Sequence, residues 1–249
     1  MHEEQWLACA DPVTLLRFLS GRKGLWGRLF PGQDAHLARR ALDRKCRLFA
    51  CAICRGVEQR FGPKFLRFIV VSERYADGSA TRAELKAARD EAYWVANPPG
   101  IVPDWEDPQP GGNALISVTA VDAVVAALRI SSVAPDLPYY FSGGKVDNAE
   151  EVVRILCGLL REVFGNPFRP LTLTSSLRSW EGGLVPRLAQ AAYEERLLPS
   201  GTLDTARLAV LADALEEAGL ADAELLSHLR SPALHVRGCH ALDTILGKA

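Results

Sequence analysis

The clearest pattern along the chain is an apolar stripe between residues 35 and 61. Its members recur at three- and four-residue spacing, at Leu42, Cys46, Phe49, Ile53 and Val57. This spacing places their side chains on one face of a helix. Gly62 and Pro63 follow, and such a pair terminates helices, so the pattern predicts one long helix over residues 35–61.

Helix-starting and helix-ending residues divide most of the remaining chain into shorter helices. Asp11 followed by Pro12 is typical of an N-cap and a first helical position, and Gly219 fits a C-terminal cap. The patterns predict helices near residues 13–19, 64–76, 79–96, 114–129, 152–163, 184–196, 204–218, 222–230 and 237–246. The β-branched content of 114–129 leaves a strand open there. The predicted fold class is all-α, a multi-helical globular protein.

Segments rich in proline and glycine separate two helical halves. The strongest of them covers residues 97–113, which is typical of a boundary or a long loop. We therefore predict an N-terminal helical half over residues 1–97 and a C-terminal helical half over 146–249. Residues 98–145 form the loop-rich connection, with one helix inside it.

Composition and charge narrow the function classes. The formal net charge of −1 over 249 residues gives no general basic excess, which makes nucleic acid an unlikely partner. No run approaches the roughly 20 apolar residues of a membrane span, so we expect no membrane partner. The start of the chain lacks a basic and then apolar leader, so we expect a cytoplasmic protein with its six cysteines reduced.

A C-x-x-C pair suggests a metal site. Cys51 and Cys54 lie close on one predicted helix and could give two thiolates to zinc, with His235 and Cys239, or His240, as further ligands. Two other interpretations stay open. Cys46 and Cys54 could be small apolar side chains of the core. Cys51, which is expected off the core face, could be a reactive thiol.

The reactive interpretation of Cys51 depends on its neighbours. Arg47 and Arg55 lie four residues before and after it, and nearby cations stabilise a thiolate. The alternative is that Cys51 packs against another helix while the arginines meet carboxylates. A Cys–His nucleophile within the segment 235–240 is a further possibility, although such pairs need spatial geometry rather than adjacency.

Several residues are candidates for binding another molecule. Arg47 and Arg55 belong to a basic helix that could meet phosphate or an acidic partner, and Arg237 lies between two predicted metal ligands. Aromatic residues in predicted loops are typical interface anchors; they include Trp26, Trp105, Tyr139 and Tyr140. The alternatives are a solvated face paired with local acids and aromatic caps over the core.

Short catalytic motifs are missing from the chain. Ser142-Gly143-Gly144-Lys145 lacks the earlier glycine and the later Ser or Thr of a phosphate-binding loop. G-x-G-x-x-G, H-E-x-x-H and G-x-S-x-G do not occur. The sequence therefore favours a non-catalytic role, although an enzyme without a recognisable motif stays open.

Six blocks of sequence carry a resemblance. They are WLACADP at 6–12, CRLFACA at 46–52, ERYADG at 73–78, FGNPFRP at 164–170, LADALEEAG at 211–219 and HVRGC at 235–239. Together they resemble a large paralogous family of uncharacterised bacterial proteins, whose biochemical role is not established. The resemblance implies a shared fold and a bacterial cytoplasmic setting. Ile53 and His240 depart from the pattern, where cysteine and tryptophan are often seen.

Taken together, the sequence predicts a non-catalytic helical protein–protein interaction or adaptor module, with another protein as its partner. The first alternative is a zinc-binding or redox-reactive thiol protein that uses Cys51 and Cys54 with the segment 235–240. The second alternative is an enzyme without a recognisable motif.

Overall fold

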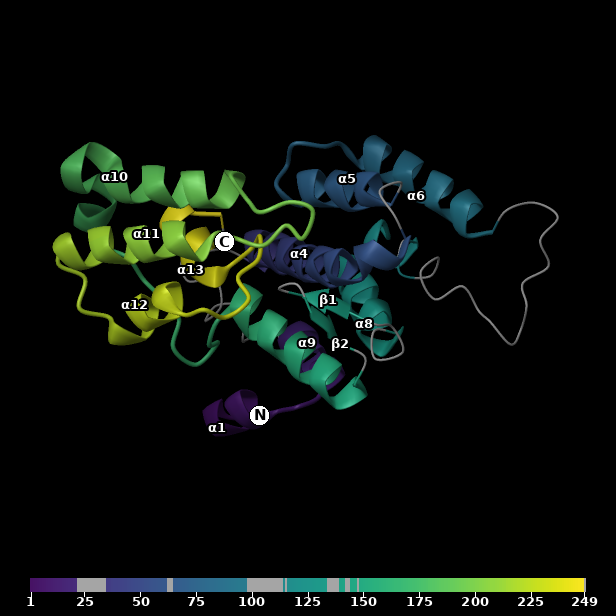
Figure 1. Ribbon diagram of the computed structural model, residues 1–249, viewed down its shortest axis with the longest axis horizontal. Coiled ribbons are helices and arrows are strands. Elements are labelled where there is room, and N and C mark those ends of the chain that lie inside the picture. Colours follow the sequence, from purple (N-terminus) through teal and green to yellow (C-terminus); the bar gives the residue numbers. More distant parts are fainter. Residues whose placement is uncertain are drawn as a thin grey trace.

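Helices make up most of the molecule. The computed structural model describes residues 1–21, 35–61, 65–97, 114, 116–133, 139–141, 144–146 and 148–248. Within these residues the only sheet is one antiparallel hairpin of β1 (Tyr139–Phe141) and β2 (Gly144–Val146), with Tyr139 opposite Val146. The predicted all-α, multi-helical fold is therefore confirmed (Figure 1). No helix of the described part is both long enough and apolar enough to cross a bilayer.

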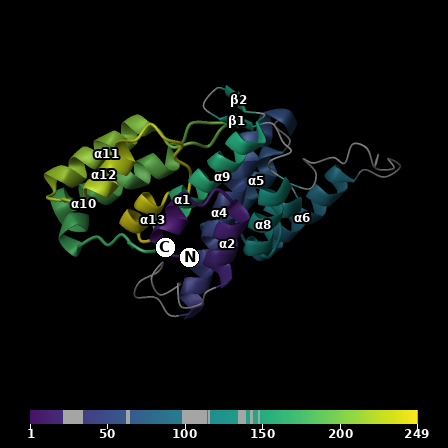
Figure 2. The same ribbon diagram turned by 90° about the horizontal axis from the view of Figure 1, so that it is seen from below.

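The helices form two groups along the chain. The first group is α1 (Glu3–Ala8), α2 (Pro12–Gly21), α4 (Ala35–Phe61), α5 (Leu66–Ala76), α6 (Arg82–Ala96), α8 (Ala123–Val133) and α9 (Ala149–Phe164). The second group is α10 (Ser175–Glu194), α11 (Thr205–Glu217), α12 (Ala223–Arg230) and α13 (His240–Leu246). Figures 1 and 2 show α10, α11 and α12 at one end of the molecule and α6 and α8 at the other.

Two large apolar cores lie in these groups, and a smaller cluster packs between α5 and α6. The first core gathers residues from Trp6 to Phe164 around α4 and also includes Val236. The second core runs from Val185 to Ile245. α9, which the sequence assigned to the C-terminal half, therefore packs into the first core, against α2 and α4. The apolar clusters change over after Phe164 rather than near residue 146.

Local sequence signals place most helix starts. The Asp11 carboxylate accepts hydrogen bonds from the backbone N–H groups of Val13 and Thr14, at 3.0 and 3.2 Å. Thr81 and Glu84 form a capping box at the start of α6. These caps satisfy N–H groups that the first turn of a helix leaves without partners.

Two predicted helices differ from the structure. Residues 114–129 were expected as one helix, but the chain leaves helical geometry around Ala120, and α8 begins only at Ala123. The helix expected over 184–196 begins earlier, at Ser175, and has a kink with non-helical backbone from Trp180 to Gly183. Glycines at positive φ allow the chain to turn there before the helix resumes.

α4 is buried on nearly all sides, which the apolar stripe did not predict. α5, α8 and α9 pack around it, and side chains off the stripe are buried as well. Arg47 and Arg55 are only 2% and 6% exposed. The basic helix is therefore not a solvated face along this stretch.

The buried charges of α4 pair with acids from distant parts of the chain. Arg44 donates to Asp243 of α13 at 2.6 Å, and Lys45 donates to the same carboxylate at 3.1 Å. Asp243 is fully buried, so its charge depends on these two partners. This contact joins the central helix of the first core to the last helix of the second.

A second set of ion pairs lies beside the first. Glu73 of α5 accepts hydrogen bonds from Arg55 and Arg196, with closest distances of 2.7 and 3.1 Å. Asp77 accepts from Arg44 and Arg237 at 2.9 and 2.7 Å. Arg196 and Arg237 come from the C-terminal group, so these pairs also cross between the two cores.

Replacement of Asp243 by asparagine is expected to destabilise the protein by about 3–5 kcal/mol, because Lys45 and Arg44 would lose their shared buried counter-charge. Urea unfolding followed by circular dichroism measures the change. Asp213→Asn is the matched control, since Asp213 pairs with Arg230 at an exposed site and should cost less than about 1 kcal/mol. Equal losses in the two variants would contradict the argument.

Stability is also expected to fall in acid. Burial disfavours the charged form of Asp243, but Lys45 and Arg44 outweigh it and lower the carboxyl pKa below its ordinary value. A depressed pKa gives stability that is present above the ordinary pKa and is lost as the pH falls through the folded value. We therefore expect the free energy of unfolding to drop below about pH 4. Urea titrations at several pH values should show that the free energy of unfolding falls less steeply with acid in Asp243→Asn than in the wild-type protein. Equal slopes in the two proteins would argue against this role of Asp243.

Candidate metal centre

Four potential metal ligands converge where the two cores meet. Glu162 lies in the last turn of α9, and His228 lies in α12. His235 and Cys239 flank the turn that leads into α13, with Cys239 at the N-cap position. One ligand atom from each residue lies within 4.8 Å of all the others. Within the described residues, this is the group of His, Cys, Asp and Glu that could hold a metal ion.

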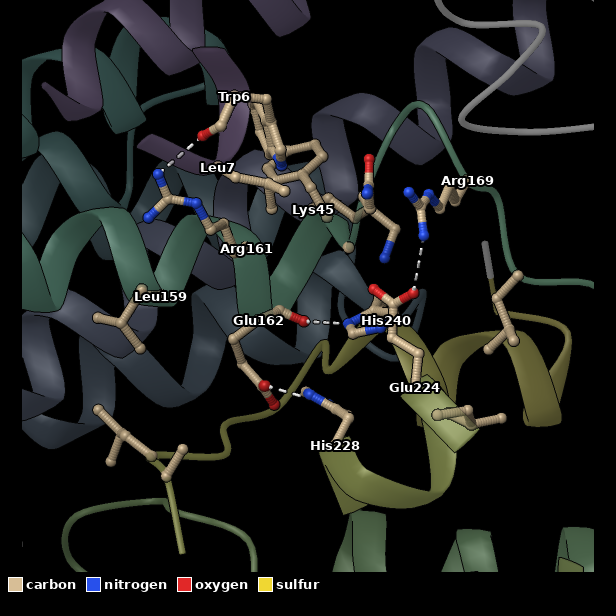
Figure 3. A pocket seen from close by; sticks show the side chains of 18 of the residues that line it. Trp6, Leu7, Lys45, Leu159, Arg161, Glu162, Arg169, Glu224, His228 and His240 are labelled. Atoms are coloured by element: carbon tan, nitrogen blue, oxygen red, sulfur yellow. Dashed lines mark hydrogen bonds and ion pairs between the residues drawn. The ribbon is translucent and has the colours of Figure 1, made fainter. Parts of the chain in front are cut away.

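The contacts in this group centre on the Glu162 carboxylate. One oxygen lies 3.2 Å from Nδ1 of His235, and the other lies 3.3 Å from Nε2 of His228. The same Nε2 is 3.4 Å from the Cys239 sulfur. Glu162, His235 and Cys239 are buried, while the His228 side chain is 22% exposed. Figure 3 shows Glu162 and His228 facing each other.

The surroundings orient two of the ligands. Nε2 of His235 lies 3.2 Å from the backbone oxygen of Ser231. A metal-binding histidine commonly donates its second ring N–H to a backbone carbonyl, which leaves the other nitrogen free for the ion. The backbone N–H of Val236 also donates to Glu162, at 3.4 Å. Both contacts fit a ligand set with fixed orientation.

Close backbone approach positions Cys239. Gly238 has φ +93°, a left-handed conformation that favours glycine. A Cβ at this position would lie 2.9 Å from Cδ1 of Leu48 on α4. Glycine therefore allows the chain to turn against α4 immediately before Cys239, with the sulfur directed to the site.

The electrostatics of the group follow from burial and from Glu162. Burial opposes ionisation of Glu162, but the hydrogen bond from His235 and the nearby imidazoles lower its pKa. Burial would lower the pKa of His235, yet its bond to Glu162 raises it. Burial lowers the pKa of His228 to about 4. Burial and the Glu162 charge raise the pKa of the Cys239 thiol. A bound cation would compensate the desolvated carboxylate and favour the thiolate.

His240 lies next to the group but contacts it differently. Its Nδ1 is 3.0 Å from the backbone oxygen of Glu162, and its ring centroid is 4.5 Å from that of His228. It is not one of the four converging residues. Its imidazole packs beside the candidate ligands.

Sequence reasoning identified half of this group. His235 and Cys239 were predicted as ligands, and the structure brings them together. Glu162 and His228 were missed. Glu162 lies three residues after Leu159 and seven after Ile155 on the apolar stripe of α9, and a carboxylate on an apolar stripe is a signal for a buried polar site.

Cys51 and Cys54, the other two predicted ligands, lie away from this group. The Cys51 sulfur is 4.0 Å from the backbone oxygen of Ile69, and the Cys54 sulfur is 3.8 Å from that of Ala114. Both thiols are buried among the helices around α4. Cys51 was expected off the core face, but α5 covers that side of α4.

The predicted binding arginines have internal partners. Arg47 donates to the backbone oxygens of Val118 and Val121, at 3.3 and 3.0 Å. Arg55 pairs with Glu73, and Arg237 pairs with Asp77. Burial thus removes Arg47 and Arg55 from the surface. Trp26 and Trp105 lie outside the described residues, as do the side chains of Tyr139 and Tyr140 in β1.

Comparisons of this chain with protein-family models, with curated proteins and with solved structures give no significant match.

The thiols make a prediction about reactivity. Burial raises the pKa of Cys51 to about 12 and that of Cys54 well above its ordinary value. Cys9 alone among the six cysteines is partly exposed. A disulfide reagent at pH 8 should therefore modify Cys9 first and the remaining thiols only after unfolding. Cys9→Ser should abolish the fast phase and Cys51→Ser should keep it; a fast phase lost in Cys51→Ser would support a reactive Cys51.

Proposed function

We propose that this chain is a zinc-binding helical protein in which the ion has a structural role. The observation that carries the proposal is the convergence of four donor atoms within 4.8 Å, from Glu162, His228, His235 and Cys239. The ion would connect α9 of the first core to α12 and the start of α13 in the second. Zinc would in this way fasten the junction between the two helical groups.

The donor set favours zinc over other common ions. It offers one sulfur, two imidazole nitrogens and one carboxylate oxygen, and zinc binds all three types. Calcium and magnesium prefer oxygen ligands alone. Four protein donors complete the tetrahedral coordination typical of structural zinc and leave no position for a reacting water. This argues for a structural rather than a catalytic ion.

A role in binding another protein is a second candidate, and one observation favours it. Tyr93 and Trp94 on α6 are 51% and 61% exposed, and their rings meet edge to face with centroids 5.5 Å apart. Exposed aromatic residues are frequent anchors of protein interfaces. We propose that the zinc site would maintain the fold of such an interaction module.

Metal content of untagged protein purified with reduced thiols and supplied with zinc tests the first proposal. Mass spectrometry should find about one zinc per chain. Cys239→Ser and Glu162→Gln should lower this content strongly, because each removes one of four ligands. Cobalt substitution should give a thiolate-to-metal absorption band that Cys239→Ser lacks.

Cys54→Ser is the matched control, since Cys54 is a buried thiol outside the group. It should keep both the zinc and the cobalt band. Two results would overturn the proposal: no metal uptake by the folded wild-type protein, or equal metal loss in Cys54→Ser and Cys239→Ser.

A further inference from the structure

A large pocket lies next to the candidate metal centre. Its volume is about 750 Å³, within the range of small-molecule sites. Residues of α1, α4, α9, α12 and α13 line it, together with the segment that follows α9. Figure 3 shows Trp6 and Arg161 on one side, Arg169 and Glu224 on another, and His228 at the end where the metal ligands lie.

Two buried hydrogen-bond donors of this pocket have no partner among the described residues. The Trp6 side chain is fully buried, and its indole Nε1 has no acceptor within the described residues. The same holds for the buried Nε of Arg161. Both residues line the pocket, and in Figure 3 the indole nitrogen is on the ring edge toward its interior. A buried donor without an acceptor is costly, so these two N–H groups call for an acceptor.

Within the described part of the chain, the charge of Arg161 also lacks a counter-charge. Its NH2 group donates to the backbone oxygens of Trp6 and Cys9, at 2.8 and 2.7 Å. No carboxylate of the described residues forms an ion pair with it. Lys45, the other cation of the pocket interior, is already paired with Asp243. An anionic acceptor in the pocket would accept hydrogen bonds from both unpartnered N–H groups and would also neutralise the charge of Arg161.

The rest of the pocket lining favours an anion with a single negative charge. Apolar side chains such as Leu7, Leu159 and Leu171 supply much of the wall. Glu151, Asp222 and Glu224 are exposed members of the lining, at its rim. These carboxylates would repel a multiply charged anion, whereas the apolar wall would accept a hydrocarbon body.

We propose that this pocket binds a small monocarboxylate with an apolar body, whose carboxylate accepts hydrogen bonds from Trp6 Nε1 and Arg161 Nε. The observations that carry it are the cavity, the two unpartnered donors and the unpaired guanidinium. These contacts do not involve zinc, although Glu162 and His228 line the same pocket.

Calorimetric titration of the full-length protein with octanoate tests the proposal. Octan-1-ol has a similar hydrocarbon body but no charge, and octyl phosphate has a larger negative charge. Octanoate should bind at one saturable site, and both comparators should bind at least tenfold more weakly. Trp6→Phe keeps an aromatic side chain but removes the indole N–H, so it should weaken octanoate binding about tenfold or more.

Trp94→Phe is the matched control, because Trp94 is exposed on α6, and it should leave octanoate binding unchanged. A second measurement needs no variant of the pocket. Nuclear magnetic resonance of the wild-type protein resolves the indole N–H groups of its five tryptophans, and octanoate should move one of them strongly. Arg161→Lys should reduce that movement while keeping the positive charge.

Four outcomes would overturn the proposal. They are no saturable octanoate binding, octan-1-ol binding as tightly as octanoate, equal effects of Trp6→Phe and Trp94→Phe, and no indole N–H that moves. Any of them would leave an ordered water as the acceptor of the two buried donors.

Discussion

The fold depends on neutralising the charges that α4 carries into the interior. A buried cation is tolerated only with a partner, and Arg44 and Lys45 share the buried Asp243. That acid lies in the last helix, almost two hundred residues away along the chain. The first core can therefore bury its central helix fully only when the end of the chain is in place. In the same way, the buried Arg55 pairs with Glu73, and Arg196 of the C-terminal group pairs with the same carboxylate.

The same closure assembles the candidate metal centre. When α13 docks on α4 through Asp243, Cys239 at its N-cap comes to the end of α9. Glu162 there is a buried carboxylate, and its oxygens lie 3.2 Å from Nδ1 of His235 and 3.3 Å from Nε2 of His228. The ion pairs of Asp243 and the four candidate metal ligands thus lie at the same junction between the two cores. Each set of contacts would stabilise the packing that the other needs.

The pocket belongs to this junction too. Lys45 lines it from α4, Glu162 and Arg161 from α9, and His240 from α13. Helices of both cores, which come together only in the folded protein, therefore line this one pocket. A ligand there and an ion at the adjacent group would contact the same helices, so occupancy of either would stabilise the folded protein.

The sequence by itself determined the elements whose signals are local. The cap at Asp11, the apolar stripe of α4 and the glycine stops depend on residues a few positions apart. His235 and Cys239 could be singled out because they lie in one short segment. Local patterns cannot show that α5 covers the other side of α4, so Cys51, Arg47 and Arg55 seemed available for chemistry. Only the tertiary structure decided that these residues are internal, and that Glu162 and His228 complete the group. The physical reason is that burial and the meeting of donor atoms are set by packing between residues far apart in the chain, whereas a helix is set by hydrogen bonds and side chains within a few turns.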